Sequence, residues 1–122
     1  MNAGFRRLPA EADLVWFTTD VTFDPGLPAR LAAAMDADPS LWAIHPAHPS
    51  DHLSHRPDSR EGVPDVREVP YVEFTAPMVR ASAYRAVFGL DENHWYWYQD
   101  LLFSKAIREL GGRMAVHHGA VL

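Results

Sequence analysis

Short apolar runs and helical spacings alternate along the first third of the chain. Residues 14–18 (Leu-Val-Trp-Phe-Thr) form an apolar run between two aspartates, which is typical of a buried strand. Apolar residues at helical spacing follow between 27 and 35, and Asp38-Pro39 predicts the end of that helix. Residues 41–44 predict a second strand. This strand–helix–strand order predicts a parallel α/β unit.

The middle of the chain shows neither pattern. Residues 46–68 are rich in His, Pro, Ser, Asp and Arg, and their few aliphatic residues predict a long irregular loop. Residues 69–74 predict a third strand, with Pro70 at an edge or at the strand start. Helical spacing over 81–88 then predicts a short helix capped by Gly89.

The clearest pattern lies near the C-terminus. An apolar stripe marks one face of a helix that starts near Gln99, and Gly111-Gly112 predicts its end. Residues 113–116 predict a last strand. Together these elements predict one α/β domain over residues 1–122, with a mostly parallel sheet, flanking helices and the long middle loop.

The composition excludes several classes of protein. Hydrophobic residues make up 48% of the chain and charged residues 22%, as in ordinary globular domains. A formal charge of −5 gives no basic surface for nucleic acid. No apolar run is long enough to span a bilayer, and without Cys there is no disulfide or thiolate chemistry. We therefore expect a cytoplasmic protein with no nucleic-acid partner and no transmembrane segment.

One carboxylate stands next to a run of aromatic residues. Residues 95–98 (Trp-Tyr-Trp-Tyr) directly precede Gln99-Asp100, so Asp100 opens the predicted helix at the border of an aromatic platform. Aromatic faces suit the C–H faces of a sugar ring, and a carboxylate beside them can take a hydroxyl proton as general base. The alternative roles are helix capping for Asp100 and core packing for at least two of the aromatic residues.

Asp20 is a candidate metal ligand. It follows the predicted strand 14–18 at the edge where open α/β sheets bind ligands, and its carboxylate suits Mg²⁺ or Mn²⁺. Thr22 adds only a neutral oxygen. A turn role for Asp20 is the alternative.

The histidines are concentrated in two places. Four stand close together in the middle of the chain: His45, His48, His52 and His55. Prolines between the first two prevent them from sharing a helical face, so the sequence favours a solvated loop over a zinc site there. His117-His118 ends the predicted last strand and offers a second candidate ligand or phosphate contact, with plain exposure as the alternative.

Five segments carry a family resemblance through their order and spacing. They are Asn2-Ala3-Gly4-Phe5, residues 14–26 (LVWFTTDVTFDPG), residues 74–92 (FTAPMVRASAYRAVFGLDE), Gln99-Asp100 and residues 111–122 (GGRMAVHHGAVL). In this order they resemble the metal- and acceptor-binding half of an inverting glycosyltransferase of family 2, which has the GT-A (Rossmann-like) fold. The second segment is similar to the strand that delivers the family's metal-binding Asp-x-Asp motif. The pair Gln99-Asp100 is similar to the Glu-Asp pair that contains the family's catalytic base.

The resemblance implies a donor side and a cation. Asp20, with Thr22 beside it, would hold Mg²⁺ or Mn²⁺ against the diphosphate of a nucleotide-sugar. The family has a later metal-ligating His, for which His118 is the candidate in this chain. Thr22 stands where the family has a second carboxylate.

The resemblance also implies an acceptor side. Asp100 would deprotonate an acceptor hydroxyl for in-line attack at the anomeric carbon, with inversion. The acceptor would be bordered by Trp95, Trp97, Gln99 and Thr75. Gln99 replaces the family's Glu.

The start of the chain near the Asn-x-Gly-Phe segment leads us to expect a partial or split transferase domain. Its partners would be a nucleotide-sugar and a glycan or other hydroxyl acceptor, together with a separate nucleotide-binding half or further copies of the chain. The alternative, from another functional class, is a non-catalytic carbohydrate-binding or assembly module that retains the fold.

Overall fold

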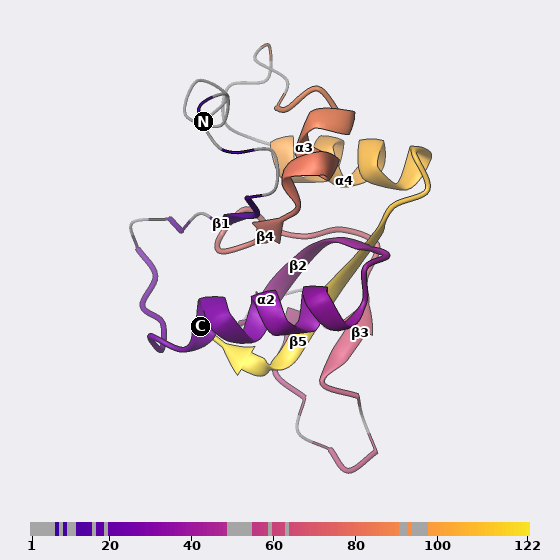
Figure 1. Cartoon of the computed structure of the whole chain (residues 1–122). Helices are drawn as coiled ribbons and strands as arrows, with labels where there is room; N and C mark the ends of the chain where they lie inside the picture. The colour runs from indigo at the N-terminus through magenta and orange to yellow at the C-terminus, as the bar shows by residue number, and fades with distance from the viewer. Residues whose placement is uncertain are drawn as a thin grey trace.

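A computed structural model describes residues 7, 9, 12–15, 17–18, 20–48, 55–58, 60–62, 64–90, 93 and 98–122. Within these ranges the elements are β1 (Leu14–Val15), α2 (Leu27–Ala37), β2 (Leu41–Ala47), β3 (Val66–Glu68), β4 (Met78–Val79), α3 (Ala81–Ala86), α4 (Gln99–Glu109) and β5 (Arg113–Val121). The strands form one sheet in the order β1-β4-β2-β5-β3 (Figure 1). No helix among the described residues is long and apolar enough to cross a membrane.

The sheet is mixed and mostly antiparallel, so the prediction of a partial GT-A (Rossmann-like) domain with a mostly parallel sheet is wrong. Only β2 and β5 pair in parallel. The short strand β4 lies between β1 and β2 and runs antiparallel to both, while β3 runs antiparallel to β5 at the other edge. The first two predicted strands are therefore separated by a strand from later in the chain. The α/β class itself is as expected.

The expected third strand over 69–74 is replaced by an irregular segment. Val69 donates its backbone N–H to the carbonyl of Met114 at 2.9 Å, but the residues after it leave the sheet. Val69 and Val72 are still buried, because the segment packs them into the core from a loop. The apolar pattern therefore reflected burial without sheet pairing. The predicted loop over 46–68 is likewise shorter than expected, since β2 extends to Ala47 and β3 occupies 66–68.

Helix α2 covers one face of the sheet (Figure 1). Pro28 falls in its first turn, where a missing N–H costs nothing, and Asp38 leaves the helix in an extended conformation before Pro39. The buried residues of this face come from α2 and from the strands beneath it: Leu27, Leu31, Met35, Leu41, Ile44, Met78, Ala115 and Ala120.

Helices α3 and α4 cover the second core, and they lie together above the strands in Figure 1. Helix α4 buries Phe103 and Ile107, and it ends as the glycines predict: Gly111 has φ +81°, and Gly112 donates its N–H to the carbonyl of Ile107 at 2.9 Å. A Cβ at position 112 would lie 2.5 Å from a ring carbon of Trp42, so only glycine fits there.

Arg80 connects α2 to the sheet at the end of β4. Its Nε donates to the carbonyl of Leu41 at 2.7 Å, and one terminal nitrogen donates to the carbonyl of Met35 at 2.5 Å. These carbonyls lie at the start of β2 and in the last turn of α2, where helical carbonyls lack partners. The guanidinium therefore fixes the α2–β2 turn against β4.

Candidate functional site

The irregular segment 69–76 joins α4 to the end of β1. Its backbone N–H at Val72 donates to the hydroxyl of Ser104 at 3.1 Å, and the rings of Phe74 and Phe103 pack with centres 5.5 Å apart. At its other end the carbonyl of Thr75 accepts the N–H of Thr18 at 3.0 Å. One short segment thus brings the β1 exit and the start of α4 into one region.

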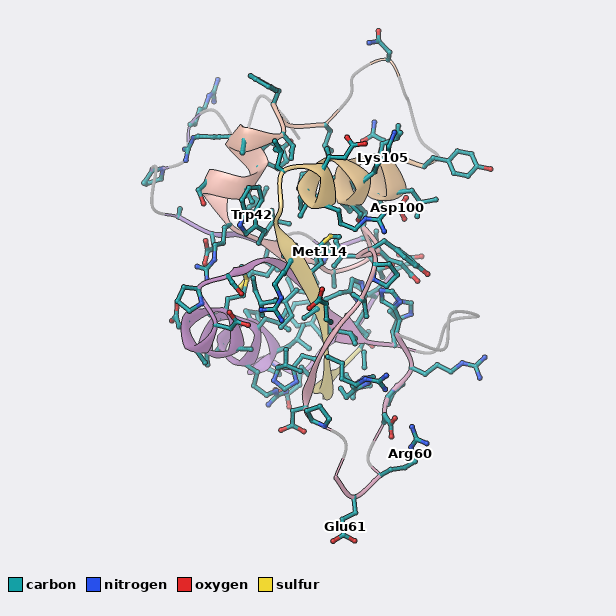
Figure 2. The ribbon with its side chains drawn as sticks, turned by 90° about the vertical axis from the view of Figure 1, so that its right-hand side faces the viewer. Trp42, Arg60, Glu61, Asp100, Lys105 and Met114 are labelled. Atoms are coloured by element: carbon teal, nitrogen blue, oxygen red, sulfur yellow. The ribbon has the colours of Figure 1, made fainter. Side chains whose placement is uncertain are left out.

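Asp100 lies in the first turn of α4, as predicted. Its Oδ1 accepts the N–H of Leu101 at 2.8 Å, and its side chain is half-buried. The unpaired amides of a helix N-terminus favour a negative charge at this position. Figure 2 shows Asp100 at one end of α4, with Lys105 farther along the same helix.

Tyr71 lies within electrostatic reach of Asp100. Burial raises the pKa of Tyr71 to about 12, and the charges of Glu73 and Asp100 add to the shift. Because both carboxylates disfavour a phenolate, Tyr71 keeps its proton and remains a hydrogen-bond donor at neutral pH. The segment 69–76 therefore supplies a second carboxylate and a phenol beside the predicted base.

A cavity of about 290 Å³ lies between α4 and the residues that follow α3. Its lining is Val87, Phe88, Gly89, Leu90, Gln99, Leu102, Phe103 and Ala106. Gln99 is the one polar side chain among these lining residues. Trp95 and Trp97 lie outside the described residues.

Two non-glycine residues near this cavity have a left-handed backbone. Phe88 has φ +60° and is 96% exposed, and Tyr98, with φ +69°, precedes the first residue of α4. Such conformations cost free energy for residues with a Cβ, and they cluster at binding sites and catalytic sites. Phe88 lines the cavity, and Tyr98 directly precedes α4.

Asp20 and Thr22 are exposed after β1. A hydrogen bond from the Thr18 side chain, followed by a backbone hydrogen bond, lowers the pKa of Asp20, so its carboxylate is ionised at neutral pH. Thr18 is also the residue that binds Thr75 through its backbone. Thr75, the candidate acceptor residue, is therefore hydrogen-bonded to a residue that stands two positions before Asp20, the candidate cation ligand.

His118 is placed differently. It is 4% exposed, its Nδ1 lies 2.8 Å from the carbonyl of Arg56, and its backbone N–H donates to Asp65. These contacts tie β5 to the segment around 56–65, and none of them involves Asp20. The structure thus joins Thr75 to the β1 exit and places Gln99 and Asp100 in the first turn of α4, but it gives His118 other partners.

A histidine cluster lies next to the same segment. The rings of His45, His48 and His55 have centres 4.9, 5.5 and 6.0 Å apart, and Nε2 of His48 lies 2.8 Å from Oε2 of Glu73. His45 and His55 are fully buried, which contradicts the solvated loop that the sequence favoured there. His52 lies outside the described residues.

The members of this cluster are electrostatically coupled. Burial, and then the charge of His48, lowers the pKa of His45 to about 3. Burial raises the pKa of Glu73, but the hydrogen bond from His48 and the charges of the histidines outweigh it, so the net shift is downward. At neutral pH the cluster therefore holds a neutral imidazole at His45 and an ionised Glu73.

Sequence reasoning did not connect Glu73 with the histidines. The signal was available in part, because the spacing of the histidines pointed to a cluster. No local pattern connects them to a carboxylate 18 residues beyond His55, which the fold brings within 4.0 Å of its Nδ1. Among the described residues, no group of three or more His, Asp or Glu side chains is already arranged to hold a metal ion.

No protein-family model matches this chain, and no curated protein matches it.

Proposed function

We propose that this chain is the acceptor-side part of an inverting glycosyltransferase that uses a nucleotide-sugar donor. The observation that carries the proposal is the segment 69–76, which hydrogen-bonds the β1 exit at Thr75 and α4 at Ser104. A transferase must bring a donor diphosphate and an acceptor base together, and this segment spans the two places where the sequence offers them. The resemblance to family 2 assigns the same two places.

On the acceptor side, Asp100 is the proposed general base. It stands in the first turn of α4, next in sequence to Gln99, whose side chain lines the cavity. An acceptor whose apolar part fills the cavity presents its hydroxyl near the Asp100 carboxylate, which removes the proton during attack on the anomeric carbon. Tyr71, which keeps its proton, can donate a hydrogen bond to a second acceptor oxygen.

On the donor side, Asp20 is the proposed ligand for Mg²⁺ or Mn²⁺. Its carboxylate is exposed and ionised, which fits a hard cation, and Thr22 is exposed two residues later. One carboxylate is sufficient for a cation that keeps several waters and takes further oxygens from a diphosphate. When bound, such a cation neutralises the leaving diphosphate. His118 remains a proposed further ligand only if it leaves the carbonyl of Arg56.

The nucleotide-binding half is proposed to come from a separate chain, and a homo-oligomer is the other arrangement proposed. Among the described strands, β1 lies at the edge of the sheet on this side, and such a half is proposed to extend the sheet there. A cytoplasmic location is likewise retained as a proposal, since the chain has no cysteine for disulfides.

Substitution of Asp100 tests the proposal. In the natural polypeptide that contains this chain, Asp100→Asn keeps the side-chain shape but removes the base. Transfer from a panel of nucleotide-sugars to hydroxyl acceptors should then fall by about 10²–10⁴-fold. The matched control is Glu109→Gln, which neutralises an exposed carboxylate on the same helix and should leave the rate unchanged.

A wild-type rate in Asp100→Asn would remove Asp100 from the chemistry. Glycan binding with no affinity for nucleotide-sugar or Mn²⁺ in calorimetry would favour the non-catalytic carbohydrate-binding module instead.

A further inference from the structure

Four potential metal ligands from three separate parts of the chain meet beside the segment 69–76. His45 lies in β2 and His48 follows its end, His55 lies in the described part of the middle segment, and Glu73 comes from 69–76. The rings of His45 and His55 pack edge to face, and both residues are fully buried from solvent. The His48 side chain is only 12% exposed. Several imidazoles gathered in one buried place need a physical reason, because each gives up hydration of its ring nitrogens.

The spacing of the imidazoles is that of ligands around one ion. With metal–nitrogen distances of about 2.0 Å, the ring centres of two imidazoles on a tetrahedral ion lie about 5 Å apart. The three ring-centre distances here are 4.9, 5.5 and 6.0 Å. The backbone has therefore already brought the rings to the separation that a shared ion requires.

His45 has the hydrogen bonding of a metal ligand that lacks its ion. Its Nδ1 donates to the carbonyl of Pro46, which leaves the lone pair on Nε2. Metal-ligating histidines characteristically donate their second ring nitrogen to a carbonyl in this way. Nε2 itself is buried and has no hydrogen-bond partner in the described part of the chain. A buried lone pair without a partner is costly, and a cation would satisfy it.

Glu73 supplies the negative charge. Its Oε2 lies 2.8 Å from Nε2 of His48 and its Oε1 lies 4.0 Å from Nδ1 of His55, so the carboxylate stands between two rings. An anionic oxygen with neutral imidazoles is a common donor set for zinc.

We propose that His45, His48, His55 and Glu73 bind one divalent transition-metal ion of the zinc type. Nε2 of His45, Nε2 of His48, the ring of His55 and the Glu73 carboxylate are the ligands. Imidazole-rich sites select zinc, copper, nickel or cobalt over magnesium. The side chains do not yet surround a common point, since no group of three or more described His, Asp or Glu is already arranged around an ion. His48 and Glu73 are in contact with each other instead.

Closing the site requires rotation of side chains only. The torsion that turns an imidazole about its Cβ–Cγ bond is broad, so the rings can reorient at low cost while their centres stay near their present places. The cation then replaces the His48–Glu73 contact, and any proton held between these two groups is released to solvent. The bound ion would join β2, the 55–58 segment and the segment 69–76.

This metal site is independent of the proposed transferase activity. The cation proposed at Asp20 is a hard ion held by oxygens, whereas the histidine cluster offers mainly nitrogens. The two sites therefore differ in the ion that they prefer, and each can fail without the other.

Co²⁺ and Zn²⁺ titrations of the whole chain test the site. Co²⁺ should give the visible absorption of a tetrahedral nitrogen-containing site at one equivalent, and Zn²⁺ should displace it while excess Mg²⁺ does not. The temperature of unfolding should rise with Zn²⁺, because the ion binds the folded chain.

Three substitutions localise the ion. His48→Gln and Glu73→Gln should each weaken Zn²⁺ affinity at least about tenfold, since even the loss of an outer hydrogen-bond partner costs 10–100-fold in known sites. The matched control is His117→Gln, which removes a histidine of β5 that lies outside the cluster and should leave the affinity unchanged. Circular dichroism without metal verifies that each variant folds. If His48→Gln does not fold, the Zn²⁺ affinity of Glu73→Gln, which keeps the side-chain size, tests the location of the ion.

Two results would overturn the proposal. One is a wild-type chain that binds no Zn²⁺ at micromolar concentration. The other is binding that persists in Glu73→Gln and His48→Gln, or that is lost equally in His117→Gln, since the ion would then lie elsewhere. Transfer activity plays no part in either outcome.

Discussion

A neutral imidazole buried in the core is the most informative single residue of this chain. His45 is fully buried between β2 and the segment 69–76, and burial together with the charge of His48 holds its pKa at about 3. In the unfolded chain the same imidazole has an ordinary pKa near 6.5. The folded and unfolded states therefore bind different numbers of protons throughout the interval between these values.

The sign of the pH dependence follows from this difference. Between about pH 6.5 and pH 3 the unfolded chain holds a proton on His45 and the folded chain does not, so stability falls as the pH falls. The contribution approaches about 1.4 kcal/mol per pH unit. Glu73 acts in the same direction below its ordinary pKa of 4.5, because its folded pKa is lowered.

We predict that His45→Gln flattens the stability profile between about pH 5 and about pH 7. The measurement is urea unfolding at each pH with a chelator present, so that no metal contributes. The comparison of slopes remains valid even if the variant is less stable at every pH. Equal slopes in the variant and the wild type would mean that His45 carries its proton in the folded state.

The sequence predicted the position of Asp100 but not the burial of the histidines. The sequence placed Asp100 in the first turn of a helix correctly, because the apolar stripe predicts the helix and the two glycines predict its C-terminal end. It favoured a solvated loop for the histidines near 45–55, because prolines and polar residues normally stay at the surface. Burial of His45 follows from the extension of β2 into the core, which local composition does not encode.

At the scale of elements, the contact between α4 and the segment 69–76 organises the candidate site. The segment has no sheet partner after Val69, so its backbone groups need other partners in the core. Ser104 supplies one of them through its hydroxyl, and Phe74 packs its ring against Phe103. Helix α4 and the segment therefore hold each other in place, with Asp100 and Tyr71 at their common end.

Ser104→Ala tests that contact. The substitution leaves the N–H of Val72 buried without its partner, which costs about 1–3 kcal/mol. We predict a loss of that size in the free energy of unfolding, measured with urea. The control is Ser82→Ala, on the exposed side of α3, which should change stability by no more than about 0.5 kcal/mol. An unchanged free energy of unfolding in Ser104→Ala would show that the segment 69–76 is held by its apolar side chains alone.

The elements that the sequence predicted well are those with complete local signals. Helix α2 has Pro28 near its start and Pro39 after its end, and α4 has Gly111-Gly112. The strands were harder, because a short apolar run is equally consistent with a strand and with a buried loop. Residues 69–74 are the example, since their apolar residues are buried without pairing in the sheet.

At the scale of the whole molecule, the order of the strands in the sheet determines which segments lie next to the β1 exit. β4 enters between β1 and β2, so the β1 exit faces the segment that leads into β4 and not the end of β2. This arrangement places Thr18 against Thr75. The pairing joins residues 57 positions apart, and sequence periodicity contains no information about such distant partners. The prediction of a parallel sheet was wrong for this reason.

The tip of the middle segment lies far from the candidate site. Figure 2 shows Arg60 and Glu61 at the opposite end of the molecule from α4. Arg60 pairs there with Asp58 at 2.7 Å, an exposed ion pair of small energetic value. Asp100, the proposed base, thus lies at the other end of the molecule from this tip.

The stereochemistry of transfer tests the central claim most directly. The natural polypeptide that contains this chain is incubated with a nucleotide-sugar, Mn²⁺ and a hydroxyl acceptor, and the anomeric proton of the first product is followed by NMR. Direct attack by an acceptor that Asp100 deprotonates predicts a product whose anomeric configuration is opposite to that of the donor, and this product should be missing in Asp100→Asn. A product that retains the donor configuration, or inverted product formed at the wild-type rate by Asp100→Asn, would contradict the account.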